Sequence, residues 1–298
     1  MQVDFKVKRA ENCALIDTKK WITDGTGITF HRMSGRDIPT FINKVLSVHP
    51  VTIQLKEVVK EGDTVLLSKI ASDISQYKKF PIHVGDERYF NCPVMQILGV
   101  FKDEEITLES LNMCTDKILI KKIGIDYKGL KLGEDNTMIG EVIKIGTNKF
   151  DKDWRKLPLS VKVGDVVLVR DNVTTKVRLK EGEYYATEDS MIVGRFDSSD
   201  FNLENLTILN NYILMSPYIS ETLGDVLLTP LLDYENEDIT EIYNRDLFRV
   251  VKVDSKVDRV LENDILLVDR NFTNYVYVGT SKYFVISGID YITSKVKK

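Results

Sequence analysis

Cysteine is scarce in this sequence, with only three in 298 residues. Cys13, Cys92 and Cys114 show no paired spacing, so we expect reduced thiols that behave as small apolar side chains. The three histidines have no cysteine or carboxylate partner at ligand spacing. This pattern argues against a metal site.

Long hydrophobic runs are absent too. No apolar run approaches the roughly 20 residues that a helix needs to cross a bilayer, and residues 1–15 lack the apolar core of a signal peptide. We therefore expect a cytoplasmic protein without a membrane partner. The net charge of −4 at pH 7 argues against nucleic acid as a main partner.

Catalytic motifs are missing as well. The sequence has no nucleophile elbow, no glycine loop that would cradle a phosphate and no HExxH pair. These absences predict that the chain has no catalytic residue, no cofactor and no enzymatic activity.

Three stretches share one pattern, a Gly-Asp or Asn-Asp turn followed by an apolar strand. They are EGDTVLLSK (61–69), VGDVVLVRD (163–171) and ENDILLVDR (262–270). Asn263 can replace glycine in this turn because asparagine tolerates the left-handed backbone conformation better than other non-glycine residues. The pattern predicts repeated scaffold strands rather than an active site.

Two segments around Leu-Glu pairs align without a gap, residues 99–119 with 194–214. Other strand-like stretches repeat in the same order. They are 13–18, 117–122 and 212–217 for the first strand, 42–50, 139–147 and 247–255 for the second, and 94–101, 190–196 and 283–290 for the last. The repetition predicts three tandem domains, residues 1–108, 109–203 and 204–298.

Each domain is predicted to be all-β. No window carries a convincing apolar helical stripe, whereas short strands rich in β-branched residues alternate with polar or glycine-containing turns. Strands of this length and spacing are typical of a small closed or partly closed barrel, which leaves few free strand edges. The linkers contain no flexible spacer, so we expect the barrels to pack closely.

The segments TDKILIKKI, IGEVIKIGTN, KLPLSVKVGDVVLVRD and YYATEDSMIVGRF follow one another in the middle domain. In this order, most of residues 113–196 resembles the co-chaperonin (GroES) family, and KLPLSVKVGD after the IGEVIKIGT strand is a specific signature. The other two domains resemble the family mainly through their alignment to the middle one. The resemblance implies three tandem GroES-like barrels.

In the GroES family seven barrels form a dome, and each extends a loop whose Gly-led apolar tripeptide docks on the rim of a chaperonin ring. The resemblance implies such a loop in each domain, at GITF, GLKL and GDVLL. The candidate partner-binding residues are Ile28, Thr29, Phe30, Leu130, Lys131, Leu132, Val226, Leu227 and Leu228.

An apolar triplet on a polar loop is a plausible docking element on physical grounds. Burying two such side chains is worth roughly 3–6 kcal/mol before the ordering entropy of the loop is subtracted. One loop would bind weakly, and a ring of tethered loops would bind tightly. Alternatively, the triplets are edge strands or packing residues between barrels, since Thr29 and Lys131 interrupt the apolar runs.

The sequence departs from the family in two ways. Residues 147–160 lie where the family makes its roof hairpin, and the other domains have only 254–259 and 51–58 at this place. A ring of seven barrels cannot be built from whole chains that have three barrels each. The copies are therefore expected either in stacked tiers or in a ring of six or nine barrels, with identical chains closing the ring.

Three functions remain open. The first is a non-enzymatic, ring-forming co-chaperonin that docks on a chaperonin ring and assists protein folding. The second is a structural ring of a bacteriophage virion, near the neck, portal or tail, with neighbouring ring proteins as partners. The third is an adaptor that uses the barrels as unrelated binding modules, which the regular linkers disfavour.

Overall fold

The computed structural model describes the following residues of the chain: 13–17, 42–48, 59–60, 62–68, 81–84, 87–93, 96–102, 106–123, 137–151, 153, 155–170, 174–218, 247–269, 273–289 and 292–296. The chain divides into two compact units. The first unit consists of Met1–Lys122, Glu141–Gly164 and Val173–Asp189. The second unit consists of Ile123–Gly140, Asp165–Asn172 and Ser190–Lys298. The domain boundaries at 108 and 203 stay predictions.

The first sheet has the strand order β4-β5-β1-β2-β3-β6-β7. Its strands are β1 (Cys13–Asp17), β2 (Ile42–Val48), β3 (Thr64–Leu67), β4 (Pro81–Val84), β5 (Glu87–Pro93), β6 (Ile97–Phe101) and β7 (Leu111–Met113). Neighbouring strands in this sheet are antiparallel.

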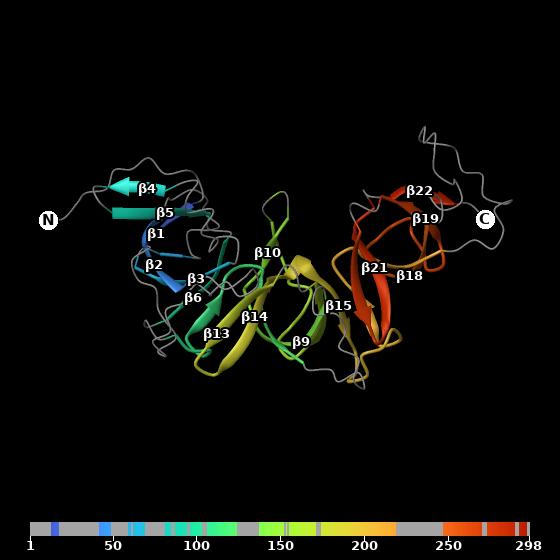
Figure 1. Ribbon diagram of the computed structural model, residues 1–298, viewed down its shortest axis with the longest axis horizontal. Coiled ribbons are helices and arrows are strands. Elements are labelled where there is room, and N and C mark those ends of the chain that lie inside the picture. Colours follow the sequence, from blue (N-terminus) through green and yellow to red (C-terminus); the bar gives the residue numbers. More distant parts are fainter. Residues whose placement is uncertain are drawn as a thin grey trace, which may run out of the picture. The chain divides into compact units, whose positions relative to one another are not determined.

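The middle sheet has the order β13-β14-β8-β9-β12-β15-β16, and its β13–β14 hairpin is drawn in yellow in Figure 1. Its strands are β8 (Lys117–Lys122), β9 (Thr137–Ile145), β12 (Val166–Arg170), β13 (Thr175–Leu179), β14 (Gly182–Glu188), β15 (Ile192–Phe196) and β16 (Leu206–Ile208). Between β9 and β12, the strands β10 (Lys149–Phe150) and β11 (Lys156–Leu157) form a separate two-stranded sheet. A single 3-10 turn, η3 (Asp189–Met191), connects β14 to β15.

The last sheet, orange to red in Figure 1, has the order β20-β21-β17-β18-β19-β22. Its strands are β17 (Tyr212–Pro217), β18 (Leu247–Val253), β19 (Ile265–Val268), β20 (Asn274–Val278), β21 (Ser281–Ser287) and β22 (Ile292–Val296). All three large sheets therefore share one connectivity, except that the last sheet ends at β22.

The all-β prediction is confirmed for the described residues, which contain no α-helix. The described strands do not confirm closed barrels, because each sheet begins and ends with strands that are not neighbours. No helix in the described part of the chain has the length and apolarity needed to cross a membrane.

The repeated turn adopts the predicted left-handed conformation. The φ angles are +88° at Gly62, +89° at Gly164 and +70° at Asn263. Asparagine therefore replaces glycine in this turn without a change of backbone region. In each turn the next residue is an aspartate, which directly precedes the strand.

The predicted last strand at 283–290 is wrong. These residues overlap β21. The counterpart of β15, which pairs with β12 in the middle sheet, is β22, which pairs with β19 in the last sheet. The apolar run before Gly288 resembles the stretch around Gly194, which explains the error. The true counterpart has Ser294 in the place of that glycine.

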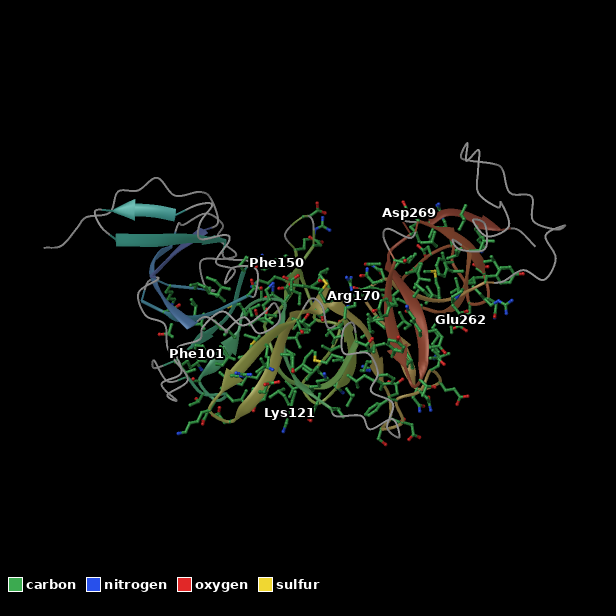
Figure 2. The ribbon with its side chains drawn as sticks, viewed as in Figure 1. Phe101, Lys121, Phe150, Arg170, Glu262 and Asp269 are labelled. Atoms are coloured by element: carbon green, nitrogen blue, oxygen red, sulfur yellow. The ribbon has the colours of Figure 1, made fainter. Side chains whose placement is uncertain are left out.

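Consecutive sheets share one core where the chain passes from one to the next. β7 is the last strand of the first sheet, and the chain continues from it into β8 of the middle sheet. In the same way, β16 is the last strand of the middle sheet, and the chain continues from it into β17 of the last sheet. We call the pairing of β7 with β6, and that of β16 with β15, a strand joint. The core at the first joint comprises Leu66, Leu98, Phe101 (labelled in Figure 2), Leu111, Met113, Leu119, Val177, Leu179, Tyr184 and Ala186. The core at the second comprises Ile139, Leu168, Val193, Phe196, Leu206, Ile208, Tyr212, Leu214, Val276, Val278 and Val285.

Candidate functional site

The predicted docking residues lie outside the described part of the chain. They are Ile28, Thr29, Phe30, Leu130, Lys131, Leu132, Val226, Leu227 and Leu228. The structure neither brings them together nor separates them, and their role stays a prediction. The described residues do define the strand ends from which these segments start.

All three candidate segments join the first strand of their sheet to the second, and residues 18–41 join β1 to β2. Residues 124–136 join β8 to β9, and the Ile123 N–H donates to the Ile139 carbonyl at 2.9 Å where the two strands end. Residues 219–246 join β17 to β18, and the Tyr218 N–H donates to the Leu247 carbonyl at 2.9 Å. A backbone hydrogen bond between neighbouring strands therefore lies at the point where each of these two segments leaves its sheet.

Side chains reinforce both bases. The Arg249 guanidinium carbon lies 5.2 Å from the centre of the Tyr218 ring, which is a cation–π contact. At the other base, the Tyr277 N–H donates to the Thr137 hydroxyl at 2.9 Å. A rigid base lowers the entropy that a docking segment must lose when it binds a partner.

A hairpin projects from the middle sheet at the predicted roof position. β10 pairs with β11 in the register Lys149 to Leu157. The Asp151 carboxylate closes the turn, because it accepts hydrogen bonds from the N–H groups of Asp153 and Arg155, both at 2.9 Å. Phe150, labelled in Figure 2, belongs to this hairpin. A hairpin is therefore present where the resemblance implies one, and it forms a two-stranded sheet of its own.

Asp189 fastens the hairpin to the sheet. Its side chain is completely buried, and one carboxylate oxygen lies 2.6 Å from the Lys149 ammonium. The other oxygen accepts hydrogen bonds from the Ser160 N–H at 2.8 Å and hydroxyl at 2.6 Å. Burying this charge is tolerable only because it is paired and hydrogen-bonded. Asp189 was not among the residues predicted to be functional, although it lies in the EDS stretch that resembles the family.

A second buried charge lies at the start of β8. Lys117 is 1% exposed, and its ammonium lies 3.0 Å from Asp116 and 2.8 Å from Glu188. Burial lowers the pKa of Lys117, but the two carboxylates more than offset this and the net effect is a raised pKa. Lys117 therefore stays charged and holds β8 to β14. In the described residues, no group of three or more metal-binding side chains forms a candidate metal site.

Comparison with known proteins places the similarity on this part of the chain. Residues 111–196, from β7 to β15, match the family described as Chaperonin 10 Kd subunit. The mitochondrial 10 kDa chaperonin of Arabidopsis thaliana is 34% identical over 84 residues, which are 26% of this chain and 86% of that protein. The co-chaperonin GroES of Geotalea uraniireducens (strain Rf4) is 31% identical over 85 residues, with shares of 26% and 88%. The co-chaperonin GroES of Ehrlichia ruminantium (strain Welgevonden) is 25% identical over 91 residues, with shares of 29% and 97%.

Proposed function

The chain belongs to the chaperonin 10 kDa subunit (GroES) family, and on this premise we propose that it is a non-enzymatic co-chaperonin built from three tandem GroES-like domains. The chains form a ring that docks on a chaperonin ring and assists protein folding. The proposed place of action is the cytoplasm. Neither nucleic acid nor a membrane takes part in this role.

One observation carries the proposal. In the segment that matches the family, residues 124–136 connect β8 to β9 and contain Leu130, Lys131 and Leu132. This is the place from which the family's docking loop is expected to start. In the last sheet, residues 219–246 connect the equivalent strands β17 and β18 and contain Val226, Leu227 and Leu228.

The shared connectivity of the sheets supports the three-domain organisation. The first, second, third and last strands occur in the same order in each sheet, and the outer hairpins β4–β5, β13–β14 and β20–β21 occupy the same edge. Such agreement across sheets is expected of a tandem repeat. A hairpin lies at the roof position between β9 and β12, whereas residues 254–259 form only short turns at this place in the last domain.

Capture of a chaperonin tests the docking assignment. The immobilised chain is incubated with a purified chaperonin ring and ATP, and the retained ring is quantified. We expect the combined variant L130S/L132S/L227S/L228S to lose capture. L157S is the matched control, because Leu157 is 39% exposed on β11 and lies outside the docking segments. Undiminished capture by the combined variant would contradict the docking assignment.

The second candidate is a permanent structural ring, such as a neck, portal-proximal or tail ring of a bacteriophage. The strand joints favour it, because a shared core at each joint holds consecutive sheets together. Electron microscopy of the purified protein separates the two functions. A stable ring that captures no chaperonin supports the structural function, whereas capture supports the co-chaperonin.

A further inference from the structure

The residue after the second strand differs between the middle and the last sheet. Gly146 follows β9, and Asp254 follows β18. Each of them donates its N–H to the carbonyl of the first residue of the neighbouring strand, which is Lys117 at 2.8 Å for Gly146 and Tyr212 at 3.1 Å for Asp254. The two sheets therefore have a glycine and an aspartate at one equivalent position.

The residue after the outer hairpin differs in the opposite way. Asp189 follows β14, and Gly288 follows β21. The Asp189 N–H donates to the Asp116 carbonyl at 2.8 Å, and β14 ends opposite the first residue of β8. The Gly288 N–H donates to the Asn211 carbonyl at 2.8 Å, and β21 ends opposite the first residue of β17. Each sheet therefore has one aspartate and one glycine at these two positions, in exchanged places.

The Asp254 carboxylate closes a short turn in the last sheet. This residue is 4% exposed, and one carboxylate oxygen accepts the Asn211 N–H at 2.8 Å. The other oxygen accepts the Lys256 N–H at 3.1 Å and the Ser255 hydroxyl at 3.5 Å. The Asp254 carbonyl accepts the Val257 N–H at 2.9 Å. Because most of these partners are the next residues of the chain, the chain turns back directly after β18.

The Asp189 carboxylate holds a longer insertion in the middle sheet. It is completely buried, and its partners are the Lys149 ammonium at 2.6 Å and the N–H and hydroxyl of Ser160 at 2.8 and 2.6 Å. Lys149 begins β10, and Ser160 comes after the end of β11. One carboxylate from another part of the chain thus joins both ends of the hairpin, which a carboxylate inside a short turn does not do.

The space around the two glycines differs. A Cβ on Gly146 would collide with the Thr115 carbonyl oxygen, which is a backbone atom, so the middle sheet has no room for an aspartate at this position. A Cβ on Gly288 would meet no atom within 4 Å. The φ angle of Gly288 is +81°, a region that aspartate enters more readily than most residues other than glycine. The last sheet therefore has room for an aspartate at the position of Asp189.

We propose that the place of this one buried carboxylate decides whether the chain between the second and third strands projects as a hairpin or turns back. A carboxylate after the outer hairpin selects the projecting β10–β11 hairpin, and a carboxylate after the second strand selects the turn. The hairpin exposes Arg155 by 75% and Leu157 by 39%, so the choice also decides whether a domain offers this surface to a partner. The inference rests on the proposed three-domain organisation and is independent of the docking segments.

Exchanging the loop tests the proposal in the full chain. Residues 146–160 are copied into the last domain in place of residues 254–259, which removes Asp254 and leaves a glycine at both positions. Gly288→Asp is then made in this grafted chain, where it supplies the missing carboxylate. The same change in the wild type adds a second carboxylate, because both positions contact the backbone of Asn211.

Hydrogen exchange of the β17 and β18 peptides, followed by mass spectrometry, measures the effect. We expect G288D to slow exchange about tenfold in the grafted chain, where the copied lysine and serine pair with the new carboxylate. In the wild type it should accelerate exchange about tenfold, because the added carboxylate is buried beside another one. A change in the same direction in both chains would overturn the proposal. Loss of protection throughout the last sheet in both grafted chains would instead contradict the equivalence of the two domains, and with it the three-domain organisation.

Single substitutions test the proposal without a graft. D189N should accelerate exchange of the peptides that contain β10 and β11 about tenfold, and leave those of residues 254–259 unchanged. D254G should accelerate exchange of residues 254–259 and leave the β10–β11 hairpin unchanged. Unchanged protection of the hairpin in D189N would overturn the proposal even if the grafted chains do not fold.

Discussion

Lys149 and Asp189 form an ion pair of 2.6 Å in which the carboxylate is completely buried and the ammonium is 25% exposed. The pair joins the start of the β10–β11 hairpin to the turn between β14 and β15. Because Ser160 donates to the same carboxylate, both ends of the insertion converge on one side chain. The hairpin is thus fixed at its base by contacts that do not depend on the residues at its tip.

Replacing Asp189 with asparagine should destabilise the chain by about 2–4 kcal/mol, because it removes the negative charge that compensates a partly buried ammonium. Urea denaturation followed by circular dichroism measures the change. D153N makes the same chemical change at an exposed carboxylate of the same hairpin, whose pairing with Arg155 is 3.7 Å long. That control should stay within about 0.5 kcal/mol of the wild type. Equal effects from the two variants would show that Asp189 is not the anchor.

Adding a methyl group at Gly194 should open the second strand joint. The new Cβ would lie 2.7 Å from the Thr207 carbonyl and 2.8 Å from a Leu206 methyl, and overpacking of this kind costs about 1–3 kcal/mol. Hydrogen exchange of the β16 amides in G194A should accelerate relative to those of β14. Unchanged protection of β16 would contradict the close approach described for this joint.

The strands that were predicted from the sequence are those with strong local signals. The Gly-Asp or Asn-Asp turn followed by an apolar run predicted β3, β12 and β19. Runs of β-branched residues predicted the first two strands of each sheet. β7 and β16 were recognised only as aligned linkers, because a three-residue strand such as Leu111–Met113 has too few residues for a period of two to stand out. Their strand character comes from pairing with a partner far along the sequence.

The anchor of the roof hairpin escaped prediction for a similar reason. Asp189 and Lys149 are far apart in the sequence, and a single aspartate in a polar stretch is normally solvated. β22 was missed because Ser294 breaks the glycine pattern that identified its counterparts. Local propensity thus predicted the scaffold, whereas the contacts that distinguish one copy from another depend on the tertiary structure.

The left-handed turns predict a graded response to substitution at Gly164. G164N should cost less than about 1 kcal/mol, because Asn263 adopts a similar φ at the equivalent turn and a side chain at Gly164 meets no atom within 4 Å. G164V should cost more, about 1–2 kcal/mol, since a β-branched residue is strained at φ of +89°. Thermal unfolding of both variants checks the order. A smaller loss for valine than for asparagine would contradict the conformational explanation.

Cys114 is predicted to be unreactive in the folded chain. Burial raises the pKa of its thiol from 9.0 to about 12, with Lys117 opposing and Asp63 and Asp116 adding to the shift. In a C13S/C92S background, iodoacetamide at pH 8.5 should therefore label the folded chain about a thousandfold more slowly than the urea-unfolded chain, since the thiolate is the reactive form.

The same shift makes stability depend on pH in one direction. Because the folded pKa lies above the unfolded one, the contribution of this thiol is complete below pH 9 and is lost as the pH rises toward 12. The free energy of unfolding of the C13S/C92S chain should fall more steeply over this range than that of the matched chain with C114A added. Parallel pH profiles, or equal labelling of folded and unfolded chains, would contradict a buried, protonated Cys114.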